Sequence, residues 1–188
     1  MSKQDARNAK DLLGMIDYEI LMLRFSVQKL DPQNAVLADK ERSVYLECFL
    51  LHYRNLIRFF SGKDHRQDKG DVSMAFPGVF CAALSESRAG WYMDQIKPLD
   101  NGEEGCIHQQ ISKLLAHCTE ARVEMIGKEW KAVEMYRKIE PVIQSFEREC
   151  LKRSDIESIT ISGEISNSTA TGNSARIINF DSALRSRD

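Results

Sequence analysis

The sequence predicts an all-α fold, an up-down bundle of about four long helices with a loop-rich middle segment and a disordered C-terminal tail. Apolar residues recur every three or four positions in long segments, and Gly, Pro and Asn are concentrated in the stretch between the second and third of these segments. A chain of 188 residues with 43% hydrophobic content is long enough for one buried core. From Ser154 onward Ser, Thr, Asn and Gly dominate. We therefore expect a helical domain over residues 1–153 and a flexible tail over residues 154–188.

The first expected helix runs from Lys3 to Leu30. One apolar stripe along it consists of Leu12, Leu13, Ile16, Ile20, Leu23, Val27 and Leu30. A second stripe, on a different side of the same helix, consists of Met15, Tyr18, Met22 and Phe25. Two apolar sides indicate that this helix either lies between two neighbours in the bundle or offers a face to a partner subunit.

A second helix is expected from Gln33 to Phe60, after the turn at Asp31-Pro32. Ser61-Gly62 ends it, because glycine commonly follows the last helical residue. Its predicted core face consists of Leu46, Phe49, Leu50, Tyr53, Leu56, Ile57 and Phe60. Two long helices joined by a short turn form an antiparallel hairpin.

The segment from Lys63 to Gly105 is interrupted by Gly, Pro and Asn-Gly, which predicts loops and one or two short helices, including Val79 to Leu84. Helical periodicity returns from Glu103 to Met125. A last helix is expected from Lys128 to Arg153, with a kink or break at Pro141.

Composition excludes several broad classes. The formal net charge is only −2, so no global field attracts nucleic acid or an anionic membrane. No apolar segment is long enough to span a bilayer and the N-terminus lacks a secretory signal, so we expect a cytoplasmic protein that does not bind membranes. Sequence motifs for nucleotide loops, hydrolase elbows and zinc peptidase helices are missing.

The cysteines predict reduced core thiols rather than disulfides, because they are odd in number and widely spaced. They are Cys48, Cys81, Cys106, Cys118 and Cys150. Cys48 and His52 are four residues apart and could hold zinc together with His117 or Cys118. Scattered ligands of this kind rarely bind a metal, so neither a metal nor another cofactor is expected.

Five polar residues on the second and third expected helices are the candidates for a site. They are His52, Arg54, Asn55, His117 and Arg122. If the two helices pack side by side, the imidazoles could accept a proton from a hydroxyl while an arginine stabilises a phosphate oxyanion, as metal-free RNA cleavage requires. Arg54 and Arg58, four residues apart, suit a phosphate-binding pair. The alternative is structural: packing histidines and solvated arginines.

The segments LECFLLHYRNLIRFF and QQISKLLAHCTEARVEMIGKEW resemble uncharacterised bacterial all-α proteins similar to the HEPN superfamily (higher eukaryote and prokaryote nucleotide-binding domains). The resemblance covers about Val44 to Phe146 and centres on HxRNL at His52 to Leu56 and AHxxxxR at Ala116 to Arg122. It implies a helical bundle, often a homodimer, in toxin–antitoxin or defence systems, and in many members a metal-independent ribonuclease.

The motif of this superfamily has Arg, a polar residue and then His. Arg54-Asn55 matches its opening, whereas Phe59, Phe60 and Ser61 stand where the His belongs, so cleavage would need His117. The leading hypothesis is thus a homodimeric, HEPN-like bundle that binds or acts on RNA or a nucleotide in prokaryotic defence. The alternative is a non-catalytic scaffold that binds a protein partner through its tail or through the second apolar stripe of the first helix.

Overall fold

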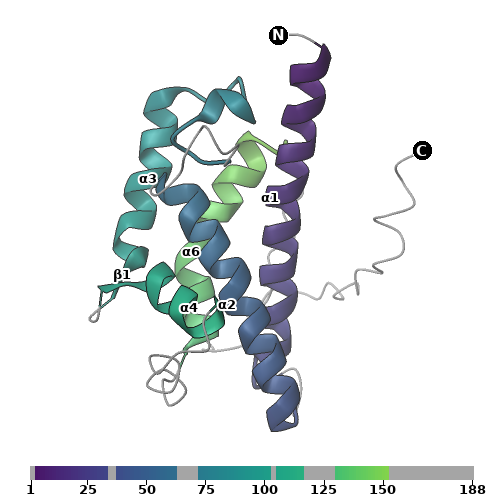
Figure 1. Cartoon of the computed structure of the whole chain (residues 1–188), viewed down its shortest axis with the longest axis vertical. Coiled ribbons are helices and arrows are strands. Elements are labelled where there is room, and N and C mark those ends of the chain that lie inside the picture. The colour runs from purple at the N-terminus through teal and green to yellow at the C-terminus, as the bar shows by residue number, and fades with distance from the viewer. Residues whose placement is uncertain (1–2, 34–36, 63–71, 103–104, 117–129, 153–188) are drawn as a thin grey trace, which may run out of the picture.

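The computed structural model describes residues 3–33, 37–62, 72–102, 105–116 and 130–152, and they form a helical bundle (Figure 1). Its helices are α1 (Lys3–Leu30), α2 (Asp39–Ser61), η2 (Pro77–Val79, a 3-10 turn), α3 (Glu86–Asp100), α4 (Ile107–Ala116) and α6 (Ala132–Glu149). Strands β1 (Asn101–Gly102) and β2 (Gly105–Cys106) form a small antiparallel hairpin between α3 and α4. The predicted all-α class is confirmed. The predicted tail, 154–188, lies outside the described residues.

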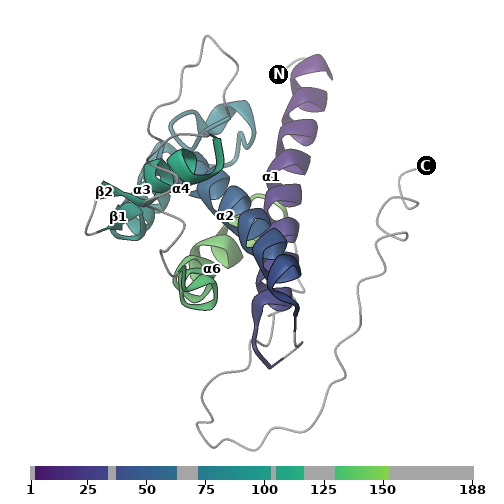
Figure 2. The same ribbon diagram turned by 60° about the horizontal axis from the view of Figure 1, so that its bottom comes forward.

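Helix α2 lies at the centre and packs against α1, α3, α4 and α6, while α1 runs along one edge of the bundle (Figures 1 and 2). The predicted core face of α2 is buried except for Leu46, which is half-buried. Phe59 and Phe60 are also buried and meet Phe146 of α6 edge-on, with ring centroids 5.4 and 5.5 Å away. Tyr92 of α3 stacks on Phe60 at 5.8 Å. These aromatic contacts join α2, α3 and α6 in one core.

The start of α2 differs from the prediction: it begins at Asp39, not at Gln33. The carboxylate of Asp31 accepts a hydrogen bond from the Gln33 amide at 3.1 Å, a local turn that competes with helix. At the helix start, Glu41 accepts from the Ala38 amide at 3.3 Å and satisfies a donor there. Gly62, with φ of 65°, ends the helix as predicted.

The middle segment contains a helix that the sequence analysis did not predict. The expected helix at Val79–Leu84 is wrong, since only Pro77–Val79 forms a 3-10 turn there, and the 15-residue α3 follows. The Ser85 hydroxyl caps α3 by accepting from the Arg88 amide at 3.2 Å. Ala89, Tyr92 and Ile96 form its buried face.

Helix α4 begins later in the sequence than predicted, and helix α6 is shorter than predicted at both ends. Helix α4 begins at Ile107 because β1 and β2 occupy the segment before it, and residues 117–129, in which the prediction ended, lie outside the described part. Helix α6 begins at Ala132 rather than Lys128 and ends at Glu149. It continues through Pro141, which is exposed, so the helix does not break there; the alternative, a kink at Pro141, stays a prediction. Within the described residues, no helix has the length and apolarity that crossing a bilayer would need.

A buried ion pair joins α1 to α6. The guanidinium of Arg24 donates to both carboxylate oxygens of Glu147 at 2.5 and 2.7 Å and to the Tyr136 hydroxyl at 3.2 Å. Arg24 is 8% and Glu147 1% exposed. Burial alone would lower the pKa of Arg24, but the interactions with Glu147 and Tyr136 together outweigh burial and raise that pKa. The pair therefore fixes how α1 docks, at the cost of desolvating two charges.

We predict that Arg24→Ala lowers the free energy of unfolding by about 3–5 kcal/mol, because it leaves the Glu147 carboxylate buried without its partner. Urea denaturation measures the effect. Lys131→Ala is the matched control, since the Lys131–Glu134 pair is 62% and 57% exposed and contributes at most about 1 kcal/mol. The double variant Arg24→Met, Glu147→Leu should lose less than Arg24→Ala. Equal losses in Arg24→Ala and Lys131→Ala would contradict the assignment.

Candidate functional site

Glu19 of α1 holds two of the predicted site residues. Its Oε2 accepts a hydrogen bond from Nδ1 of His52 at 2.7 Å and another from Nδ2 of Asn55 at 3.1 Å. We call Glu19, His52 and Asn55 the Glu19 cluster. The ring of Tyr18 packs edge-on against the His52 imidazole at 5.7 Å, and His52 is 5% exposed. The structure thus brings His52 and Asn55 together as part of the α1–α2 interface.

An open hollow of about 550 Å³ lies beside α1 and the end of α6. Its described lining includes Glu19 and Tyr18 but not His52, Arg54 or Asn55. A general base must reach the proton that it removes, and the His52 imidazole is instead enclosed against Tyr18 and bonded to Glu19. The geometry of the Glu19 cluster therefore suits a hydrogen-bonded packing network, the structural alternative considered for the histidines.

Arg54 and Arg58 lie outside this cluster and are half-buried on the outward side of α2. The Nε of Arg54 is enclosed, and within the described residues it has no hydrogen-bond acceptor. Burial, and then the nearby charge of Arg58, lower the pKa of Arg54. A guanidinium with an unused donor next to a second cation can accept an anionic ligand such as phosphate.

The remaining predicted site residues, His117 and Arg122, lie outside the described residues. Their convergence with His52 and Asn55 stays a prediction. So does ribonuclease activity, because His117 is the imidazole that the mechanism would need.

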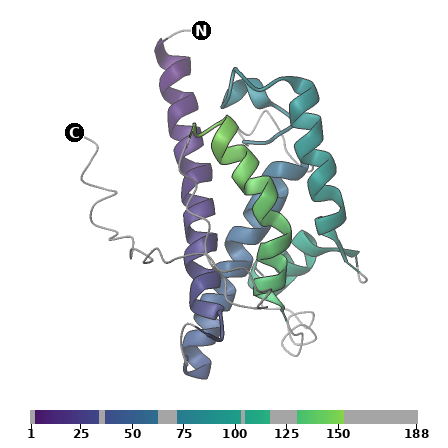
Figure 3. The same ribbon diagram turned by 180° about the vertical axis from the view of Figure 1, so that it is seen from behind.

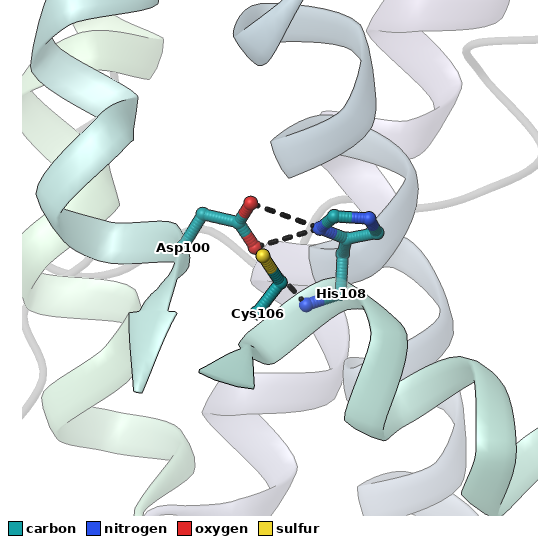
Figure 4. A group of neighbouring side chains, drawn as sticks. All are labelled: Asp100, Cys106 and His108. Atoms are coloured by element: carbon teal, nitrogen blue, oxygen red, sulfur yellow. Dashed lines mark hydrogen bonds and ion pairs between the residues drawn. The ribbon is translucent and has the colours of Figure 1, made fainter. Parts of the chain in front are cut away.

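A group that sequence reasoning missed lies where α3, the β1–β2 hairpin and α4 meet. It consists of Asp100, Cys106 and His108, which point toward one another from these three elements (Figure 4). We call it the donor cluster. Asp100 is fully buried, and its oxygens lie 2.8 and 2.9 Å from Nδ1 of His108. Asp100 also accepts from the His108 amide at 3.1 Å and so satisfies a donor at the start of α4.

The donor cluster also borders the central helix. Burial raises the pKa of the Tyr53 hydroxyl, and the charge of Asp100 raises it further, which shows that Asp100 lies close to α2.

Among the described cysteines, Cys48, Cys81, Cys106 and Cys150 are free thiols, as predicted, and Cys118 lies outside the described residues. One sequence feature could have indicated the donor cluster: Cys106 and His108 are two residues apart and follow shortly after the turn signal Asn101-Gly102. On the continuous helix expected there, their side chains would have pointed about 200° apart.

Comparisons of the chain with protein-family models, with curated proteins and with solved structures give no match. The resemblance to the HEPN superfamily remains a prediction from the two sequence segments.

We predict that Glu19→Ala lowers the free energy of unfolding by about 1–3 kcal/mol, because it removes the acceptor from the buried donors of His52 and Asn55. Chemical denaturation at neutral pH measures the loss. Asp94→Ala, which changes an exposed acid of α3, is the control and should stay within about 0.5 kcal/mol of the unchanged protein. A Glu19→Ala variant as stable as this control would show that the cluster does not stabilise the interface.

Proposed function

We propose that the protein is a non-catalytic interaction protein that works as a homodimer assembled through the outer face of α1. The observation that carries the proposal is the exposure of the second apolar stripe: Met15 is 56%, Tyr18 52% and Phe25 37% exposed, and Met22 is half-buried. Large apolar side chains that share one helix face in this way are typical of a protein–protein contact. We call this face the α1 stripe.

The spacing of the α1 stripe favours a second copy of the same chain as the partner. Its four residues are three, four and three positions apart, the pattern of a helix–helix seam. In an antiparallel pair centred at the level of Ile20, Met15 faces Phe25 of the other copy and Tyr18 faces its Met22, since each pair is equally far from residue 20. A two-fold axis produces such self-complementary contacts.

Charge complementarity supports the same register. Asp11 and Lys29 are exposed at the two ends of the α1 stripe and are also equally far from residue 20, so each would meet the opposite charge of the other copy. A parallel pair would place Asp11 beside Asp11 and Lys29 beside Lys29, which is unfavourable.

The arrangement of the bundle leaves room for this contact. Helix α1 lies at the edge, with α2 and α6 on its inner sides (Figure 3). The open hollow adjoins the α1 stripe and is lined by Gly14, Met15 and Tyr18, where glycine leaves space for a large side chain such as Phe25 of the other copy. A cytoplasmic location and a role in prokaryotic defence or a toxin–antitoxin pair belong to the proposal and rest on the sequence alone.

We predict that exchanging charges at the ends of the α1 stripe controls dimerisation. Asp11→Lys and Lys29→Asp, each alone, place like charges across the antiparallel pair and should weaken the dimer by roughly tenfold or more. The double variant restores opposite charges and should recover dimerisation. Sedimentation equilibrium at low ionic strength measures the dissociation constant.

Val44→Glu provides the matched control, because Val44 is 64% exposed on α2 and lies outside the α1 stripe. Phe25→Glu should abolish the dimer, whereas Val44→Glu should leave it intact. An unchanged protein that sediments as a monomer at all concentrations would overturn the homodimer. If the unchanged protein dimerises but the double variant Asp11→Lys, Lys29→Asp does not, the antiparallel register is excluded.

A second candidate function is the binding of an RNA or nucleotide phosphate by Arg54 and Arg58, favoured by two like charges one helical turn apart on α2, which an anion would neutralise. This candidate keeps the leading hypothesis from the sequence but assigns the ligand to the arginines of α2, not to the enclosed His52.

We predict that Arg54→Ala and Arg58→Ala each weaken binding of a fluorescent single-stranded RNA and lower the dependence of affinity on salt by about one counterion. Fluorescence anisotropy at several salt concentrations measures both. Arg148→Ala, an exposed arginine of α6, is the control.

The same samples, kept in EDTA, test catalysis by RNA integrity. Intact RNA with the unchanged protein agrees with a non-catalytic role. Cleavage that His117→Ala removes would contradict that role, and binding that neither Arg54→Ala nor Arg58→Ala weakens would remove the second candidate.

A further inference from the structure

We propose that the donor cluster is a binding site for one divalent transition metal ion of the Zn²⁺ class, held by a carboxylate oxygen of Asp100, the Cys106 thiolate and Nδ1 of His108. This site lies at the far end of the bundle core from the α1 stripe and does not depend on the proposed dimer. Three different donor types, from α3, β2 and α4, meet within 4.8 Å of one another (Figure 4).

The distances suit a small ion after a minor adjustment. A tetrahedral zinc ion holds nitrogen and oxygen ligands about 3.3 Å apart and sulfur slightly farther away. Nδ1 of His108 now lies 2.8 and 2.9 Å from the two Asp100 oxygens. Separating these groups by about half an ångström, through side-chain rotation, would admit the ion between them. The backbone bond from the His108 amide to Asp100 can remain, because the carboxylate has a second oxygen.

The backbone already holds the three donors in place, so binding would require little ordering. Asp100 ends α3, the pairing of Asn101 with Cys106 closes the hairpin, and His108 lies in the first turn of α4. Asp100 is fully buried, His108 is 5% exposed and Cys106 is half-buried. Rigid, largely enclosed donors lose little conformational entropy when they bind an ion.

The chemistry of the donors selects the class of metal. Thiolate and imidazole prefer zinc and similar transition ions, whereas Mg²⁺ and Ca²⁺ require sites made of oxygen ligands. The Cys106 thiol loses its proton on binding, and the proton on Nδ1 of His108 moves to Nε2, so that both atoms present lone pairs to the ion. Three protein ligands leave one tetrahedral position for a further ligand.

The test uses the full chain after removal of metals with a chelator and dialysis. Titration with Co²⁺ should produce visible absorption of a tetrahedral ion and a near-ultraviolet thiolate charge-transfer band that saturates at one ion per chain, and Zn²⁺ should abolish both. Mg²⁺ should produce no change. Cys106→Ser should remove the charge-transfer band and weaken Zn²⁺ binding by about tenfold or more, while Cys48→Ser should retain both.

Thiol labelling of the unchanged protein gives a readout that no variant can compromise. Zn²⁺ should slow alkylation of Cys106, read from peptide masses, and leave the half-buried Cys48 unaffected. If Zn²⁺ protects neither thiol, or if Cys106→Ser and Cys48→Ser bind Co²⁺ with the same charge-transfer band, the proposal is overturned. The labelling result therefore tests the proposal even if the Cys106→Ser variant does not fold.

Discussion

The burial of α2 on most of its sides is the constraint on which the rest of the structure depends. A helix surrounded by α1, α3, α4 and α6 buries polar side chains that need partners, and two of these neighbours carry acidic groups that face them. Glu19 of α1 accepts from His52 and Asn55. On another side, Asp100 raises the pKa of Tyr53. Arg54 and Arg58 are half-buried and take no part in these two contacts.

Helix α6 orients the two helices that flank it. Near its end, Glu147 binds Arg24 of α1, and two residues later Glu149 binds Arg88 of α3. Residues two apart point to different sides of a helix, so one turn of α6 can hold α1 and α3 at once. The Arg24–Glu147 pair is buried, whereas the Arg88–Glu149 pair is about one-third exposed. The hydrogen bond from Arg88 lowers the pKa of Glu149. The buried pair therefore contributes more to the specificity of docking than the exposed one.

Local patterns in the sequence were sufficient to predict that the long helices exist and roughly where they lie. Helix α1 has the predicted bounds, and the buried residues of α2 follow the predicted core face, because apolar spacing indicates which side of a helix faces the core. Helix α3 was missed because Gly90 and Pro98 within it imitate loop residues, although Ser85 supplied an N-cap signal. Its stability comes from burial of Tyr92 and Ile96, which propensity does not report.

The candidate site was less predictable because its contacts are not local. At about 100° per residue, helical spacing places His52 and Asn55 on a different side of α2 from Arg54 and Arg58. It cannot reveal the acceptor of the first two, which is Glu19, 33 and 36 residues away in sequence. Asp100 and His108 meet only because the chain reverses at β1 and β2. Periodicity indicates which side a residue occupies, whereas the identity of its partner depends on how the helices pair.

The candidate binding features lie away from the polar residues of α2 that first suggested catalysis. His52 and Asn55 are hydrogen-bonded to Glu19 of α1, and a group already committed to a buried hydrogen bond is less free to react. The candidates for binding are instead the exposed apolar side chains of α1 and the donor cluster at the α3–α4 junction. A core whose polar groups are hydrogen-bonded to one another's helices is rigid, and a rigid core holds the surrounding binding groups in fixed positions. Fixed positions lower the entropy that binding would otherwise cost.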